Sequence, residues 1–168
     1  MSTIDKINKL SRSEFVKVFA NIFEKTKWIA EKLYNQKPFD SFEDLCSKML
    51  GIFETANREA QLKILKSHPD LADKVTVNSL TTNSRTEQSN AGLDQGSEEE
   101  FNEFKDLNKS YKQKYGFPFV IAAKGKNKIE ILSEFKKRIL NSVDAEFNEA
   151  IIQVGKIANL RLNEINIK

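Results

Sequence analysis

Cysteine and histidine are nearly absent from this 168-residue sequence, which contains one residue of each type, Cys46 and His68. A single cysteine excludes an intramolecular disulfide and favours a reducing compartment. A zinc site needs three or four clustered ligands, drawn from Cys, His and carboxylates. One histidine and one cysteine do not supply that set, so we expect no metal site.

The sequence also lacks long apolar runs and a strong charge of one sign. No stretch approaches the roughly 18 apolar residues of a membrane-spanning helix, and residues 1–6 lack the apolar region of a secretion signal. The net charge is only +3, and lysines alternate with Glu and Asp along the chain, whereas nucleic-acid-binding proteins concentrate basic residues on one face. We therefore expect a cytoplasmic protein that binds neither membranes nor nucleic acids.

What the sequence does contain is a series of helix signals. Apolar residues recur at helical spacing behind residues that can cap a helix, for example Ser11 and Ser97, each with a glutamate three residues later. The polar stretch Lys74–Asn83 is expected to be a loop, and Ser84 could cap a short helix after it. The other expected helices cover residues 11–22, 26–34, 41–53, 57–67, 97–115, 129–140 and 144–165. The pattern predicts an all-α fold, a single-domain bundle of about seven to nine helices over residues 1–168.

One stretch departs from the helical pattern. Phe117–Ala123 is short and apolar and is bounded by Gly116 and Gly125. The sequence offers it no partner strand, so we expect an extended, buried segment rather than part of a sheet. Its buried backbone groups must find hydrogen-bond partners elsewhere, and a bound ligand is one candidate.

Polar residues that could take part in catalysis or ligand binding gather between Ser67 and Leu93. His68 precedes Pro69, which restricts its backbone, and could be either a structural histidine or a proton donor near neutral pH. Glu87 has the capping-box spacing from Ser84, so it could serve either helix initiation or a ligand. Asp70 could cap the turn after the proline.

Three further residues allow two interpretations each. Asn108, on an aromatic helix stripe, could be a buried amide or part of a pocket wall. Arg161 interrupts the apolar stripe of the last helix. Its guanidinium either extends to water or is buried beside a carboxylate or an anionic ligand. Cys46 lies on an apolar stripe without a basic neighbour, which favours a small buried hydrophobe over a nucleophile.

The set of candidate functional residues consists of one histidine (His68), one glutamate (Glu87) and one arginine (Arg161), together with hydroxyl and amide donors. It contains no nucleophile with an evident base, no metal set and no phosphate-binding loop. Such a set suits cofactor-free acid–base chemistry on a small anion.

The motifs resemble those of the OHCU decarboxylases, which act on 2-oxo-4-hydroxy-4-carboxy-5-ureidoimidazoline in purine breakdown. The matching blocks follow one another in order along nearly the whole chain: Ser67-His68-Pro69-Asp70-Leu71, Ser84-x-x-Glu87-Gln88-x-x-Ala91-Gly92-Leu93, Leu107-Asn108-x-x-Tyr111, Tyr115-Gly116-Phe117-Pro118-Phe119-Val120, Arg138, and Ile157-Ala158-x-x-Arg161-Leu162. Tyr115 stands where the family often has Phe, which should leave a packing role intact. The interval between His68 and Ser84 is not tightly patterned.

The resemblance implies an all-α, usually homodimeric carboxy-lyase that uses neither metal nor organic cofactor. It implies the conversion of this ureide substrate to (S)-allantoin with loss of CO2. It assigns His68 as the proton donor, Glu87 as the carboxylate at the polar ring substituents and Arg161 as the arginine that holds the ligand. Other positions that correspond to ligand-lining ones are Pro69, Ser84, Arg85, Thr86, Gln88, Phe119, Val120, Ile121, Ala122 and Ala123.

These assignments require His68, Glu87 and Arg161, which are remote in sequence, to meet around one small pocket lined by the kink at Pro118. Two other hypotheses remain. One is a helical interaction module that keeps the family scaffold without activity. The other is a related enzyme that acts on another ureide or hydroxy-acid ring.

Overall fold

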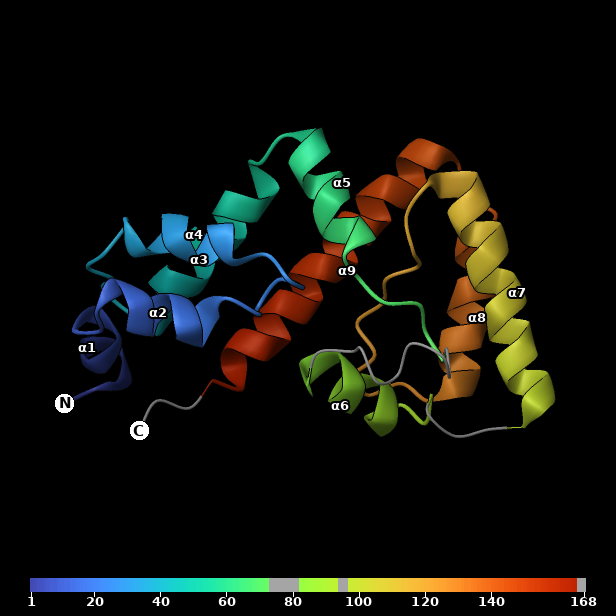
Figure 1. The fold of residues 1–168 in the computed structure, drawn as a ribbon, viewed down its shortest axis with the longest axis horizontal. Coiled ribbons are helices and arrows are strands. Elements are labelled where there is room, and N and C mark those ends of the chain that lie inside the picture. Colours follow the sequence, from blue (N-terminus) through green and yellow to red (C-terminus); the bar gives the residue numbers. More distant parts are fainter. Residues whose placement is uncertain (73–81, 94–96, 166–168) are drawn as a thin grey trace. The chain divides into compact units, whose positions relative to one another are not determined.

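The computed structural model describes residues 1–72, 82–93 and 97–165. These residues form nine α-helices, and no strand is assigned among them, which confirms the predicted all-α class (Figure 1). The helices are α1 (Thr3–Asn8), α2 (Arg12–Phe19), α3 (Lys27–Tyr34), α4 (Phe42–Glu54), α5 (Arg58–Lys66), α6 (Thr82–Asn90), α7 (Glu98–Tyr115), α8 (Lys128–Arg138) and α9 (Val143–Asn163). None of them is long and apolar enough to cross a membrane, in the part of the chain that is described.

Helix caps explain most of the helix starts. Ser11 and Ser97 form complete capping boxes with Glu14 and Glu100, as predicted. Gly116 ends α7 in the left-handed region, with φ of 82°. Helix α1 was not predicted, because it is short and its few apolar residues show no sustained period.

The predicted start of α6 differs from the structure. The expected loop Lys74–Asn83 lies largely outside the described residues, but its last two residues belong to α6, which begins at Thr82. Ser84 is therefore inside α6 and is buried instead of capping the helix. The nine residues of α6 include no aliphatic or aromatic side chain, so no apolar period could locate its start. Residues 118–123 belong to no assigned helix or strand, and the chain between α7 and α8 runs there as an open thread (Figure 1), which agrees with the expected extended segment outside a sheet.

The chain forms two compact units, each of which has its own core. The first comprises Met1–Ile64 and the chain from Gly155 onward, and the second comprises Leu65–Val154. Helix α9 contributes its first half to the second unit and its second half to the first. The expectation of one domain over residues 1–168 stays a prediction.

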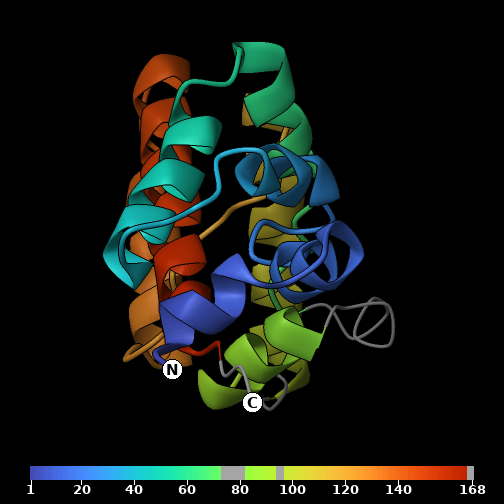
Figure 2. The ribbon, with the colours of Figure 1, turned by 90° about the vertical axis from the view of Figure 1, so that its left-hand side faces the viewer.

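The first unit is built around aromatic side chains from its short helices. In it, α2 packs against α3, and α3 packs against α4 (Figures 1 and 2). Phe15 is fully buried, and its ring contacts those of Phe19, Tyr34 and Phe39. The Asn8 side chain exchanges two hydrogen bonds with the backbone of Phe39, at 2.9 and 2.8 Å, which ties α1 to the chain before α4.

Cys46 lies in α4 and is 9% exposed. Burial, together with the nearby Glu43 carboxylate, raises the pKa of its thiol. A raised pKa lowers the thiolate fraction at neutral pH and so disfavours nucleophilic chemistry. Both observations agree with the interpretation of Cys46 as a small buried hydrophobe.

The second unit encloses the extended segment, residues 117–123, in an aromatic cluster. Helices α7 and α8 lie side by side, and the extended segment connects them in sequence (Figure 1). Tyr111 is fully buried, and its ring contacts those of Phe117, Phe119 and Phe135 edge-on. Phe119 stacks on Phe135 with ring centroids 3.9 Å apart. The apolar side chains of the segment are thus packed by both flanking helices.

Two glycines provide a matched pair of stability tests. Gly116→Ala places a side chain at φ of 82° and should lower the free energy of unfolding by about 1 kcal/mol. Gly51→Ala adds a Cβ inside α4, where no atom lies within 4 Å, and should raise it by about 0.5–1 kcal/mol. Urea unfolding followed by far-ultraviolet circular dichroism measures both changes. If both substitutions changed the free energy of unfolding in the same direction, the conformational roles given to these two glycines would be wrong.

Candidate active site

His68 follows the end of α5 and is only 9% exposed, so its imidazole does not point into bulk solvent. The turn that leads out of α5 places it, because its backbone N–H donates to the carbonyl of Leu65 at 3.2 Å. Pro69 then prevents the helix from continuing, since proline disfavours the helical conformation of the residue before it. A largely shielded histidine on a restricted backbone suits the predicted role of a proton donor.

The chain after Pro69 is fixed by side chains of α6 and α7. The Gln88 amide oxygen accepts from the Ala72 N–H at 3.0 Å, and its amide nitrogen donates to the Asp70 carbonyl at 3.4 Å. The Asn108 amide nitrogen donates to the Leu71 carbonyl at 2.9 Å. Ala72 has φ of 55°, a conformation that costs a residue other than glycine about 1 kcal/mol. These bonds offset that cost and hold the segment that carries His68.

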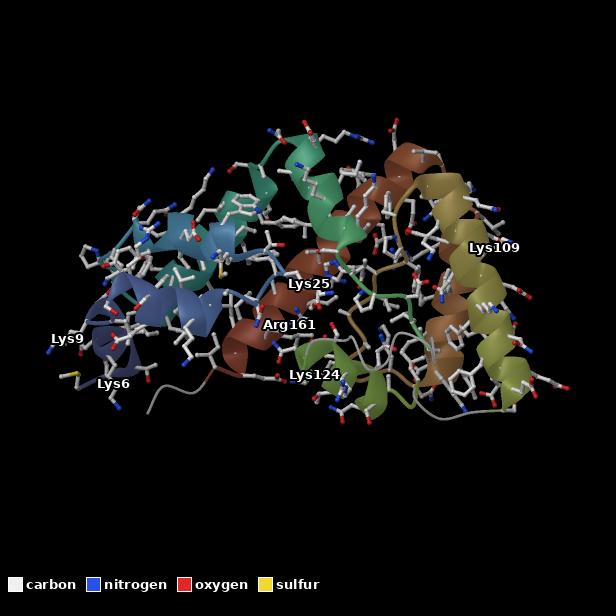
Figure 3. The ribbon with its side chains drawn as sticks, viewed as in Figure 1. Lys6, Lys9, Lys25, Lys109, Lys124 and Arg161 are labelled. Atoms are coloured by element: carbon white, nitrogen blue, oxygen red, sulfur yellow. The ribbon has the colours of Figure 1, made fainter. Side chains whose placement is uncertain are left out.

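Asp70 and Asn108 each have a more specific environment than the sequence indicated. Asp70 accepts from the Lys112 ammonium at 2.7 Å, so its carboxylate binds α7. Asn108 is 4% exposed, and its amide oxygen has no hydrogen-bond partner among the described residues. It is a buried amide, and it also lines a hollow of about 810 Å³ beside Asp70 and Lys109 (Figure 3 labels Lys109 on α7).

Helix α6 separates its predicted ligand-lining residues into two groups. Ser84 and Gln88 are one helical turn apart and both buried. Glu87 is half-buried, whereas the side chains of Arg85 and Thr86 lie on the exposed side of the helix. Both polar atoms of the Gln88 amide bind the backbone after Pro69, so the structure gives Gln88 a supporting position.

The extended segment has a distinctive hydrogen-bonding pattern. The Val120 carbonyl accepts from Arg138 at 2.7 Å, and the Ala122 N–H donates to the Gln153 side chain at 2.9 Å. No hydrogen bond within the described residues uses the N–H or C=O groups of Phe119 or Ile121, although both residues are at least 94% buried. Buried backbone groups of this kind require a partner, and a ligand can supply one.

Arg138 and Glu146 form a buried ion pair behind this segment. Nε and Nη2 of Arg138 lie 2.8 and 2.6 Å from the same Glu146 oxygen. The Tyr111 hydroxyl donates to that oxygen at 2.6 Å, and the Asn141 amide donates to the other oxygen at 3.0 Å. Burial, and next the hydrogen bond to Glu146, raise the pKa of Tyr111 well above its usual value of 10.0. The phenol therefore stays protonated and continues to donate.

One face of α7 contacts both candidate ligand-lining segments. Asn108 binds the carbonyl of Leu71, and Tyr111, three residues later, packs its ring against Phe119 at 5.5 Å between centroids. Residues three apart share a helix face. Helix α7 therefore contacts both the backbone near His68 and the extended segment, through two side chains on one of its faces.

Arg161 lies on α9 in the first unit, beside the α2–α3 connection where Figure 3 labels Lys25. Its side chain is 3% exposed and pairs with the buried Glu24 at 3.1 Å. It also donates to the carbonyls of Asn21 and Ile22, both at 3.2 Å. Of the two interpretations, burial beside a carboxylate is correct. Its meeting with His68 and Glu87 around one pocket stays a prediction.

No role was predicted for Arg138, Glu146 or Gln153. A signal was present, because Arg138 continues the buried stripe of Ile131 and Phe135 in α8. No three His, Cys, Asp or Glu side chains of the described ranges gather in a way that could hold a metal ion.

The fold and these residues define a class of protein: an all-α protein whose histidine-bearing turn and extended apolar segment are both held against one helix. Comparison with known proteins gives the family. The family model of the OHCU decarboxylases matches residues 8–163. The chain belongs to the OHCU decarboxylase family, as its motifs predicted.

Individual relatives support the assignment. The chain is 40% identical over 165 residues to the uric acid degradation bifunctional protein of Bacillus sp. (strain TB-90), covering 98% of this chain and 32% of that protein. It therefore spans about a third of the bifunctional relative. It is 38% identical over 162 residues to the 2-oxo-4-hydroxy-4-carboxy-5-ureidoimidazoline decarboxylase of Haloferax volcanii, covering 96% of this chain and 95% of that protein. A crystal structure of an OHCU decarboxylase in the presence of (S)-allantoin has a TM-score of 0.68 and 25% identity, covering 82% of this chain and 89% of that one.

The buried pair of Arg161 and Glu24 can be tested by stability. Glu24→Gln preserves shape but leaves the guanidinium buried without its counter-charge, which should lower the free energy of unfolding by about 3 kcal/mol. The control is Glu103→Gln, which breaks the exposed pair with Lys136 and should change it by at most about 1 kcal/mol. Equal effects of the two substitutions in urea unfolding would show that the Glu24 pair does not stabilise the first unit.

Proposed function

We propose that this chain is a cofactor-independent carboxy-lyase that converts 2-oxo-4-hydroxy-4-carboxy-5-ureidoimidazoline to (S)-allantoin and CO2. The observation that carries the proposal is the family match over residues 8–163. The Haloferax volcanii relative has this name and is matched over almost its whole length. The crystal structure obtained in the presence of (S)-allantoin supports a small ureide as the ligand.

The reaction makes few demands on the protein. When the bond to the carboxylate breaks, its electron pair stays on the carbon framework, and the adjacent unsaturated ring of the substrate can accept it. CO2 leaves, and one proton is added to one face of the ring to set the configuration of allantoin. The protein therefore has to orient the substrate, stabilise the developing charge and deliver that proton.

His68 is proposed as the general acid. General acids contribute about 10²–10⁴-fold in rate, and the hydrogen bonds around residues 70–72 hold the backbone that presents this imidazole. Glu87 would bind the hydroxyl group of the substrate. Arg161 is assigned to an anionic or carbonyl oxygen of the ligand.

The extended segment is proposed to bind the ureide part of the substrate. A ureide carries neighbouring N–H and C=O groups, which match the N–H and C=O groups of Phe119 and Ile121 that no described residue uses. Pairing of these groups would satisfy both partners in a buried environment, where an unpaired polar group is costly. Pro69, Ser84 and the remaining residues of 119–123 would complete the lining.

Substitution of His68 tests the chemistry. In His68→Asn, single-turnover formation of (S)-allantoin from freshly generated substrate should slow by at least about 100-fold, because the proton donor is lost. Glu87→Gln should slow it as well, whereas Glu103→Gln removes an exposed carboxylate from α7 and should leave the rate unchanged. CO2 release and chiral analysis of the product are the measurements.

A wild-type rate and stereochemistry in His68→Asn would exclude His68 as the acid. Absence of CO2 release from the wild-type protein would instead favour an interaction module that has kept the family scaffold. Turnover of another ureide in a substrate panel, without turnover of the proposed substrate, would favour a related enzyme. The three outcomes are therefore distinguishable.

We also propose a single domain over residues 1–168 that acts as a homodimer in the cytoplasm. The matched residues 8–163 include most of the first compact unit and the whole of the second, which supports their folding together. Static light scattering should give twice the mass of one chain, and thermal unfolding should show one transition. A monomer, or two separate transitions, would contradict the respective proposal.

A further inference from the structure

A buried polar network lies behind the extended segment, and its contact with that segment is specific. Arg138 and Glu146 have side chains that are 6% and 0% exposed. Arg138 uses Nε and Nη2 for the carboxylate and Nη1 for the Val120 carbonyl, at 2.7 Å. The guanidinium also lies over the Phe119 ring, 4.3 Å from its centroid. One side chain thus contacts two successive residues of the segment.

Stability alone does not account for this pair. Replacing a buried ion pair by apolar residues of similar size is often neutral or stabilising, because both charges lose their hydration. What apolar side chains cannot provide is a donor directed at a carbonyl group. The fork of an arginine provides several donors in fixed directions, and here one of them fixes the backbone at Val120.

Gln153 makes the complementary contact two residues later. Its amide oxygen accepts from the Ala122 N–H at 2.9 Å, and its amide nitrogen donates to Glu149 at 2.8 Å, which sets the orientation of the amide. In an extended chain the N–H and C=O groups of one residue point to the same side, and those of the next residue point to the other. Bonds at Val120 and Ala122 therefore hold one side of the segment and turn the groups of Phe119 and Ile121 to the opposite side.

We propose that Arg138 and Gln153 are positioning residues that hold the extended segment so that the N–H and C=O groups of Phe119 and Ile121 receive the ureide part of the substrate. The ligand class and the site rest on the proposed function. The positioning itself is a property of the protein and can be measured without a ligand.

Two variants remove one backbone contact each while avoiding an unpaired buried charge. Gln153→Leu removes the acceptor for the Ala122 N–H. Arg138→Met combined with Glu146→Gln removes the donor to Val120 and neutralises its partner, and the new glutamine can still accept from Tyr111. Each variant should raise the Kd for (S)-allantoin and the KM about three- to tenfold, the loss expected when the partner groups are misplaced, with a smaller change in kcat.

Two matched controls separate positioning from folding. Tyr111→Phe removes a hydrogen bond to Glu146 but leaves Val120 and Ala122 untouched, so it should lower the unfolding temperature without raising the Kd. The exchange Gln153→Glu with Glu149→Gln keeps an acceptor for the Ala122 N–H and a donor–acceptor pair between the two side chains. It should restore the affinity lost in Gln153→Leu.

Amide hydrogen exchange of residues 117–123 in the free protein provides the readout that does not depend on activity. Exchange should accelerate in Gln153→Leu and in the Arg138 double variant, but not in Tyr111→Phe. Unchanged exchange in both variants, or an equal change in Tyr111→Phe, would overturn the inference. Accelerated exchange in a protein that neither binds (S)-allantoin nor releases CO2 would support positioning while refuting the proposed function.

Discussion

A buried backbone that belongs to neither helix nor sheet must find hydrogen-bond partners in side chains, and this requirement organises the second unit. Residues 118–123 have no helix or ladder to satisfy them. Two of their polar groups are bound by Arg138 and Gln153, from α8 and α9. Those side chains are fixed in turn by Glu146 and Glu149. The positions of α8 and of the first half of α9 are therefore coupled to the conformation of the segment.

Helix α7 relates this segment to the turn that carries His68. Asn108 and Tyr111 occupy the same face of α7, where one binds the Leu71 carbonyl and the other packs against Phe119. Tyr111 also donates to Glu146, so the aromatic cluster and the ion pair share a member. Displacement of α7 would disturb both segments together. The proposed acid and the proposed substrate-binding backbone need fixed relative positions, and one rigid helix can provide them.

The sequence predicted local features well and long-range partners poorly. Ser11, Ser97 and Gly116 revealed helix ends because their chemistry acts within one turn. Helix α6 was mislocated because its residues lack an apolar face. Periodicity located Arg161 on a buried stripe, but it could not identify Glu24, which lies more than a hundred residues away. Periodicity could not identify Val120 as the partner of Arg138 either, because a side-chain bond to a backbone carbonyl leaves no pattern in the sequence.

The two buried arginines show the same arrangement in separate units. Each lies on the apolar stripe of a helix, pairs with a buried glutamate and donates to backbone carbonyls of a non-helical stretch: Arg161 to Asn21 and Ile22, and Arg138 to Val120. In both, the carboxylate compensates the charge, and Nη1 donates to carbonyls that no helix satisfies. Each of the two arginines therefore also holds an irregular stretch of backbone. A helical protein can stabilise the irregular segments between its helices in this way.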